Sequence, residues 1–241
     1  MSAPIEKLEE RMDYSFRDVQ LLERALTHRS FSGEHSYAED NERLEFLGDA
    51  ILELLVSETL MKRFPDYAEG RLTKIRSQLV SADNLYAVAV RLQLGSCLRL
   101  GKAEENSGGR EKKALLADSL EAIIAAVYLD SNIENSRSLV DRLITTNDRL
   151  VEADATLAEH NPKSTLQELL QARKLPPASY EVVAEEGPAH QLTFRVALTI
   201  GEFCKTTGKG SSKKIAEQQA AAQAISDPGL GKMLVEPPKS R

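Results

Sequence analysis

Acidic residues recur at helical spacing in the stretch from Asn41 to Leu52, which reads NERLEFLGDAIL. A helix over this stretch would place three carboxylates on one face, because they lie three and seven residues apart: Glu42, Glu45 and Asp49. Leucine and isoleucine residues occupy the opposite face, as in a helix that packs on a core. Taken alone, this pattern is equally typical of a solvated acidic surface.

A second stretch, residues 114–129, is a long apolar run that contains two acids, Asp118 and Glu121. A helix this apolar is expected to be buried, and charged side chains are almost never fully buried without a partner. The two acids are three residues apart and therefore share a face. The alternative interpretation is that they cap a helix, pair with an arginine, or mark a narrow exposed strip.

Glu45 and Asp49 on the first helix, with Asp118 and Glu121 on the second, form a possible metal site. Paired acids on two facing helices are a familiar way to build such a site in a helical core. Oxygen ligands favour hard ions such as Mg²⁺ or Mn²⁺, which support phosphodiester hydrolysis. Di-iron sites use Glu-x-x-His, and no histidine is suitably placed. The four scattered histidines and two cysteines argue against zinc.

Phe46 departs from the apolar face of the first helix. At 100° per residue it points to the carboxylate side, beside Glu45 and Asp49. An aromatic ring there is expected to be exposed in an isolated subunit unless another surface receives it. The sequence therefore predicts a docking contact at Phe46.

Length and composition indicate a globular protein, with 241 residues of which 41% are hydrophobic. No apolar run is long enough to span a membrane, and the first residues lack the apolar core of a secretory signal. Cys97 and Cys204 show no pairing pattern, which favours a reducing, cytoplasmic location. No feature indicates a small-molecule cofactor.

The net charge of −6 is unevenly distributed. From His160 onward there are 11 Lys/Arg against 8 Asp/Glu, which leaves about −9 for the first 159 residues. An acidic first part and a basic second part indicate two modules with separate tasks.

The sequence predicts an all-α domain followed by a small α+β domain of order α-β-β-β-α. The expected boundaries are a helical domain at 1–150, a linker at 151–162, the α+β domain at 163–227 and a disordered tail at 228–241. Within the first domain, we expect a helix at 41–64, a glycine-rich polar loop at 101–110, and a last helix at about 133–150. Within the second, strict alternation at 191–200 predicts a half-buried antiparallel strand.

Five side chains of the second domain are candidate contacts for duplex RNA. Lys213 and Lys214 begin a helix after a glycine-rich turn, where backbone N–H groups already favour phosphate. His190 lies in a loop between strands, and Gln167 and Glu168 lie on the first helix. Three such regions suit A-form RNA, contacted over about 16 base pairs. A Lys-Lys pair alone is usually just solvated, but here it occurs with the α-β-β-β-α order.

Four segments of the first domain resemble bacterial ribonuclease III: ALTHRS, NERLEFLGDAIL, FPDYAEG and LLADSLEAIIAAVYLD. Three further segments resemble the double-stranded-RNA-binding domain attached to that enzyme: KSTLQELLQ, EEGPAH and GKGSSKKIAEQQAA. The resemblance covers roughly Met1 to Ser226 in the family's domain order. It departs mildly at Ser164, where threonine is frequent, and at Ser211, where a basic or small residue often stands.

The resemblance implies a Mg²⁺-dependent endonuclease, for which Mn²⁺ can substitute, that cuts both strands of duplex RNA. It implies metal-binding roles for four acids: Glu45, Asp49, Asp118 and Glu121. Asp49 and Glu121 would be the two most closely tied to catalysis. Glu42 and Glu69 would lie at the ends of the cleft and help to handle the substrate.

The resemblance also implies a homodimer in which Phe46 inserts into a socket on the other subunit. The expected products carry 5′-phosphate and 3′-hydroxyl ends with short 3′ overhangs, and the expected role is processing of rRNA and other RNA precursors.

Two other functions fit parts of the same pattern. One is a protein of the same fold that binds duplex RNA without cutting it, but such a relative is expected to have lost one or more of the four acids. The other is a helical dimerisation module with an unrelated RNA-binding tail, which leaves Asp118 and Glu121 inside an apolar helix unexplained. The sequence therefore favours the nuclease.

Overall fold

The structure is a computed structural model that describes residues 3–188, 191–202 and 204–230. The chain forms two compact units, each treated separately below. The first contains residues up to Pro65 together with Leu72–Val151, and the second contains Asp66–Arg71 together with the residues from Glu152 onward. Among the described residues, no helix combines the length and the apolar character that a membrane span requires.

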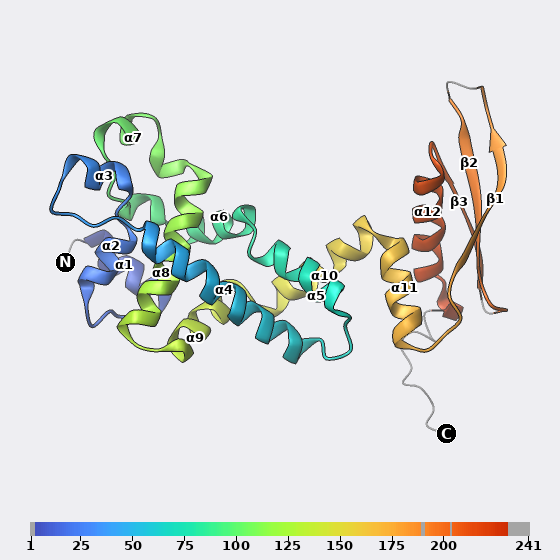
Figure 1. Ribbon diagram of the computed structural model, residues 1–241, viewed down its shortest axis with the longest axis horizontal. Helices are drawn as coiled ribbons and strands as arrows, with labels where there is room; N and C mark the ends of the chain where they lie inside the picture. Colours follow the sequence, from blue (N-terminus) through green and yellow to red (C-terminus); the bar gives the residue numbers. More distant parts are fainter. Residues whose placement is uncertain (1–2, 189–190, 203, 231–241) are drawn as a thin grey trace. The chain divides into compact units, whose positions relative to one another are not determined.

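The first unit is helical, as the sequence predicts (Figure 1). Its helices are α1 (Ala3–Met12), α2 (Val19–Ala25), α3 (Arg29–Glu34), α4 (Glu42–Arg63), most of α5 (Glu69–Leu79), α6 (Ala82–Arg91), η1 (Leu94–Cys97), α7 (Lys102–Asn106), η2 (Gly109–Glu111), α8 (Lys113–Asp130), α9 (Ile133–Leu143) and the start of α10 (Asn147–His160). Helix α8 is the centre of the unit, because ten of its residues are buried and α2, α4, α6 and α9 all pack against it.

Helix α4 is fixed at its start by the buried residue Asn41. The Asn41 side-chain amide donates to the backbone oxygen of Ala25 at 3.3 Å and to Ser119 Oγ at 3.4 Å. Its backbone N–H donates to the oxygen of Thr27 at 2.9 Å. A buried amide that makes these bonds holds the first turn of α4 against both α2 and α8. Pro65 follows the end of α4, where a proline cannot continue the helix.

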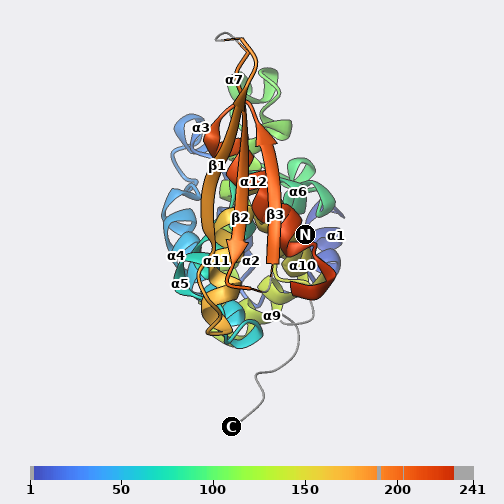
Figure 2. The same ribbon diagram turned by 90° about the vertical axis from the view of Figure 1, so that its right-hand side faces the viewer.

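The second unit contains a three-stranded antiparallel sheet in the order β1-β2-β3, formed by β1 (Ser179–Glu186), β2 (Thr193–Ile200) and β3 (Cys204–Gly210). Figure 2 views this sheet face on, and Figure 1 shows α11 (Pro162–Ala172) and α12 (Lys213–Ile225) together on one side of it. The expected α-β-β-β-α order is confirmed. Leucines and alanines of the two helices form one core with alternate residues of β2, as period-two burial predicts.

Helix α12 packs close to β3 because β3 contains glycine at the contact. A Cβ atom at Gly208 would lie 2.1 Å from the backbone oxygen of Ala216 and 2.4 Å from the backbone nitrogen of Ala220. Glycine at position 208 therefore allows the backbone of α12 to approach β3 this closely.

The structure corrects the expected glycine-rich loop at 101–110. These residues form α7 and η2, and Arg110 holds them in place. Its Nη1 donates to the backbone oxygens of Gly95 at 2.7 Å and Leu98 at 2.9 Å, and its Nε and Nη2 donate to Glu105. On the other side, Glu34 accepts from the backbone N–H of Lys102 at 2.8 Å. Long-range contacts fold a segment whose composition is that of a loop.

The expected last helix and tail are also corrected. The single helix expected at 133–150 is two helices, α9 and α10, and α10 continues through residues assigned to the linker. Residues 228–230 are helical and Leu230 is buried in the core of the second unit, so the expectation of a disordered tail is wrong for these three residues. Residues 231–241 lie outside the described residues. The domain boundaries themselves stay predictions.

Candidate active site

Helices α4 and α8 cross with their backbones in contact. A Cβ atom built on Gly48 would lie 1.9 Å from the backbone oxygen of Glu121 and 2.5 Å from its carbonyl carbon. Only glycine allows two helices to approach this closely at the crossing point. Glu121 lies at the crossing, and Glu45 and Asp118, each one turn away, are brought close to it.

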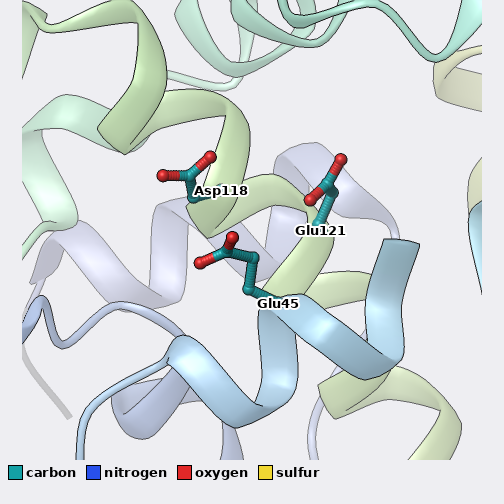
Figure 3. Close-up of side chains that lie close together, drawn as sticks. All are labelled: Glu45, Asp118 and Glu121. Atoms are coloured by element: carbon teal, nitrogen blue, oxygen red, sulfur yellow. The ribbon is translucent and has the colours of Figure 1, made fainter. Parts of the chain in front are cut away.

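Three carboxylates meet beside this crossing (Figure 3). Glu45 from α4 and Asp118 and Glu121 from α8 each offer an oxygen atom, and these atoms all lie within 4.8 Å of one another. All three side chains are partly buried. One cation with metal–oxygen bonds of about 2 to 2.5 Å fits between oxygens at such separations. The set contains only oxygen donors, which suits Mg²⁺ or Mn²⁺.

Burial raises the pKa values of all three acids of this cluster, and repulsion between acids adds to the rise at Glu45 and Glu121. Burial, together with smaller contributions from the charges of Asp49, Asp118 and Glu45 in that order, raises the pKa of Glu121 to about 8. Burial also raises the pKa of Glu45, with added repulsion from Asp118, Glu42 and Asp49, and burial raises that of Asp118. A cation stabilises a partly buried site in which negative charges repel one another. The residues therefore fit a divalent metal ion.

The fourth predicted ligand, Asp49, is exposed and is not one of the three clustered acids. It nevertheless contributes the largest charge effect on the pKa of Glu121, so it lies beside the cluster. Glu42 is exposed and pairs with Arg29 at 3.3 Å. Glu69 begins α5, belongs to the second unit and is exposed.

Two residues that the sequence reasoning left without a role lie near the acids. The charge of His28 opposes the rise in the pKa of Asp118, and Arg29 pairs with Glu42 and opposes the rise in that of Glu45. Both belong to the ALTHRS segment. The available signal was a histidine and an arginine that closely precede an acidic helix, but their approach to the acids depends on the tertiary fold.

The raised pKa of Glu121 predicts that the stability of the metal-free protein falls with pH. Between the ordinary value of 4.5 and about 8, the folded state binds more protons at this site than the unfolded state. The free energy of unfolding therefore decreases as pH rises through this window and levels off above it. A divalent metal should reduce the fall, because it binds the ionised carboxylates. Thermal unfolding across this pH range, with and without Mg²⁺, measures the effect. Glu121→Gln should flatten the metal-free curve, and an unchanged slope in that variant would contradict the assignment.

Helix α12 presents the two candidate lysines at its start. Ser212 caps the helix by accepting from the backbone N–H of Ile215 at 3.2 Å. Lys213 Nζ lies 3.2 Å from Glu185 Oε1 and 5.5 Å from the centre of the Phe194 ring. Lys214 is exposed and has no ion pair within the part of the chain that the structure describes. Both lysines are accessible to a phosphate.

The other three predicted RNA contacts differ in exposure and in whether the structure describes them. Gln167 is exposed on α11, while Glu168 is half-buried with its carboxylate 3.9 Å from the guanidinium of Arg71. His190 lies outside the described residues. The loop that leads to it starts at Gly187, whose φ of +103° suits glycine and few other residues.

Phe46 is exposed, as its position on the helix predicts. Its side chain is 82% exposed, and two further apolar residues of α4 are also exposed, Leu54 at 52% and Met61 at 66%. Apolar residues scattered singly on a surface are ordinary, but these three share one side of a single helix. That arrangement is typical of a surface that a partner covers.

Comparison with known proteins identifies the family. The protein-family model described as "Ribonuclease-III-like" matches residues 18–147, which is more than half of the chain. A second family model, described as "Double-stranded RNA binding motif", matches residues 162–227. Ribonuclease 3 of Solibacter usitatus is 47% identical over 225 residues, covering 89% of this chain and 83% of that protein. Ribonuclease 3 of Carboxydothermus hydrogenoformans is 44% identical over 220 residues, covering 90% and 93% respectively.

Solved structures agree with this similarity. The nuclease domain of ribonuclease III from Campylobacter jejuni is 46% identical with a TM-score of 0.56, covering 61% of this chain and 97% of that domain. Another structure of that domain, with the same identity and TM-score and covering 59% and 97%, concerns flexibility in a region involved in its dimer formation. The chain therefore belongs to the ribonuclease III family and is an endoribonuclease that carries a double-stranded-RNA-binding domain.

Proposed function

We propose that this protein is a Mg²⁺-dependent endoribonuclease that hydrolyses phosphodiester bonds on both strands of duplex RNA. The observation that carries this proposal is the cluster of Glu45, Asp118 and Glu121, whose oxygens lie within 4.8 Å of one another at the crossing of two helices. An acidic residue whose only role is to be solvated does not require other acids this close to it. A cation relieves the repulsion among the three carboxylates.

Glu45, Asp118 and Glu121 would hold the ion, with Asp49 at its margin. When bound, Mg²⁺ supplies positive charge that stabilises the phosphoryl and leaving oxygens during hydrolysis. Glu121 would hold the ion as an ionised carboxylate, although burial and the neighbouring acids raise its pKa in the metal-free protein. Asp49 is exposed and its charge acts on Glu121, so we propose that it orients an attacking water. Exposed Glu42 and Glu69 are proposed to assist substrate handling.

Incubation of labelled duplex RNA with the protein, with and without Mg²⁺, tests the activity directly. We expect discrete short products with 5′-phosphate and 3′-hydroxyl ends and short 3′ overhangs, formed with Mg²⁺ or Mn²⁺ and absent with a chelator. Retarded but intact duplex in the presence of the ion would favour the alternative, a protein that binds duplex RNA without cutting it.

We propose that a homodimer supplies two active sites, one for each strand of the duplex. Support comes from exposed Phe46 on α4 and from the dimer-forming region of the related Campylobacter jejuni nuclease domain. Phe46→Asp should shift the protein from dimer to monomer in light scattering, because it places a charge where an aromatic ring is expected to be buried. Tyr37→Asp, at another highly exposed aromatic residue, is the control and should remain a dimer. Retention of the dimer in both variants would exclude Phe46 as a main contact.

Lys213 and Lys214 are proposed to contact RNA phosphates. Replacing both by alanine should weaken duplex binding on the order of tenfold for every sequence and reduce the salt slope by up to about two. Fluorescence anisotropy with duplexes of several sequences, at several salt concentrations, measures both quantities. Lys205→Ala with Lys209→Ala removes two exposed lysines from β3 and matches the change in charge. A changed sequence preference with an unchanged salt slope would count against phosphate contacts.

We further propose that Gln167, Glu168 and His190 complete the RNA-binding surface, and that the protein processes rRNA and other RNA precursors in the cytoplasm. The two free cysteines are consistent with a reducing compartment. Accumulation of unprocessed rRNA precursor in cells that lack the gene tests this role.

A further inference from the structure

Lys213, one of the proposed phosphate contacts, already has an anionic partner within its own domain. Its ammonium lies 3.2 Å from the carboxylate of Glu185, near the end of β1. Glu185 is paired with Phe194 of β2 in the strand register, and Lys213 also lies over the Phe194 ring at 5.5 Å. Strand β1 and helix α12 therefore meet at this lysine, and the pair is half exposed, with 58% and 48% of the two side chains accessible.

We propose that Glu185 competes with RNA phosphate for Lys213 and thereby limits the affinity of this domain for duplex RNA. The inference rests on the proposed function, because it takes Lys213 as a phosphate contact. It makes Glu185 an affinity-determining residue that itself makes no favourable contact with the nucleic acid.

The competition follows from the chemistry of the groups. An ammonium is a compact charge that interacts with whichever anion is near. When a phosphate approaches Lys213, the carboxylate of Glu185 remains on the adjoining strand, so two negative charges lie near one cation. The phosphate must displace an existing ion pair and remain beside a like charge. Both effects weaken binding, and both are screened as salt rises, because the Debye length falls from about 10 Å at 0.1 M to about 3 Å at 1 M.

The neighbouring acid provides a matched control. Glu186 is the next residue of β1 and carries the same charge, but it pairs with Arg195 at 3.0 Å rather than with Lys213. Removal of either acid changes the net charge equally. Only removal of Glu185 frees Lys213. A general effect of net charge would appear in both variants, whereas competition for Lys213 would appear in one.

The experiment measures binding of the full chain to a labelled duplex of about 16 base pairs, by fluorescence anisotropy in the presence of a chelator so that no cleavage occurs. Glu185→Gln is expected to bind about threefold tighter at about 50 mM salt, the scale that an exposed ion pair supports. The gain should shrink towards about 200 mM, so the variant has the steeper salt dependence. Glu186→Gln should bind like the unchanged protein. No gain in Glu185→Gln, or an equal gain in both variants, would overturn the proposal.

A double-variant cycle shows whether Glu185 acts through Lys213. In a Lys213→Gln background, Glu185→Gln should no longer increase affinity, whereas a persistent threefold gain would mean that Glu185 repels RNA directly. The same data distinguish failure of the proposed phosphate contact at Lys213 from failure of the competition by Glu185. If Lys213→Gln alone leaves affinity unchanged, Lys213 is not a phosphate contact and that part of the proposed function fails. If Lys213→Gln weakens binding while Glu185→Gln has no effect, only the competition is refuted.

Glu185→Asp, which retracts the carboxylate by one methylene, should give a smaller gain than Glu185→Gln.

Discussion

Glu121→Gln is expected to slow cleavage of duplex RNA by about a thousandfold, which corresponds to about 4 kcal/mol of transition-state stabilisation. Glu121 is the most strongly perturbed acid of the cluster, and the amide keeps its size while removing one ligand charge. Duplex binding without metal should change by less than about threefold, because the proposed phosphate contacts belong to α12. Single-turnover cleavage and anisotropy on the same duplex measure the two quantities.

Glu10→Gln is the matched control for this variant, since it makes the same substitution at an exposed position on α1 outside the cluster. It should cleave at the original rate. Equal losses of cleavage and binding in Glu121→Gln would contradict the division of labour between the two domains. A normal cleavage rate in that variant would remove Glu121 from the active site.

Gly48→Ala is expected to destabilise the protein by about 1–3 kcal/mol through overpacking, although alanine is favoured over glycine in an isolated helix by about 1 kcal/mol. The sign is reversed because the added methyl group would overlap the backbone of Glu121, which no change of rotamer relieves. The two helices must separate, and Glu45 should then move away from Asp118 and Glu121. Cleavage and Mg²⁺ affinity should therefore fall even at temperatures where the variant is fully folded.

Denaturant unfolding, calorimetric titration with Mg²⁺ and cleavage assays together measure this effect. Gly33→Ala is the control, because a Cβ atom at Gly33 of α3 meets nothing within 4 Å. That variant should be as stable as the original or slightly more so. If Gly48→Ala were as stable and as active as Gly33→Ala, the close crossing would have no part in forming the site.

The sequence predicted the parts of the site that depend on position within a helix. Spacing alone placed Glu45, Asp118 and Glu121 on the correct faces, and it predicted that Phe46 would be exposed. A helical wheel does not contain the point at which two helices cross. For that reason it did not distinguish Glu45, inside the cluster, from Asp49, exposed at its margin. The helices cross where Gly48 meets the backbone of Glu121, and a contact between two distant segments cannot be read from the spacing within one helix.

The fold likewise has elements that the local sequence predicted and elements that it did not. Alternating residues of β2 predicted a half-buried strand, and the sheet confirms it because burial on one face requires that period. The segment that forms α7 offered no comparable signal, since its glycine-rich and polar composition is that of a loop. It is ordered by Arg110, whose partners Gly95 and Leu98 lie 15 and 12 residues earlier in the chain. Contacts of this kind are not visible in local sequence.

The anchoring of α7 has a consequence for whatever meets that part of the surface. A loop of the same composition would sample many conformations, and a partner would have to select one of them at an entropic cost. Here Arg110 on one side and Glu34 on the other have already fixed the backbone during folding. An incoming molecule therefore meets a backbone whose conformation is already fixed. Binding there depends on how well the shape of that molecule fits this surface.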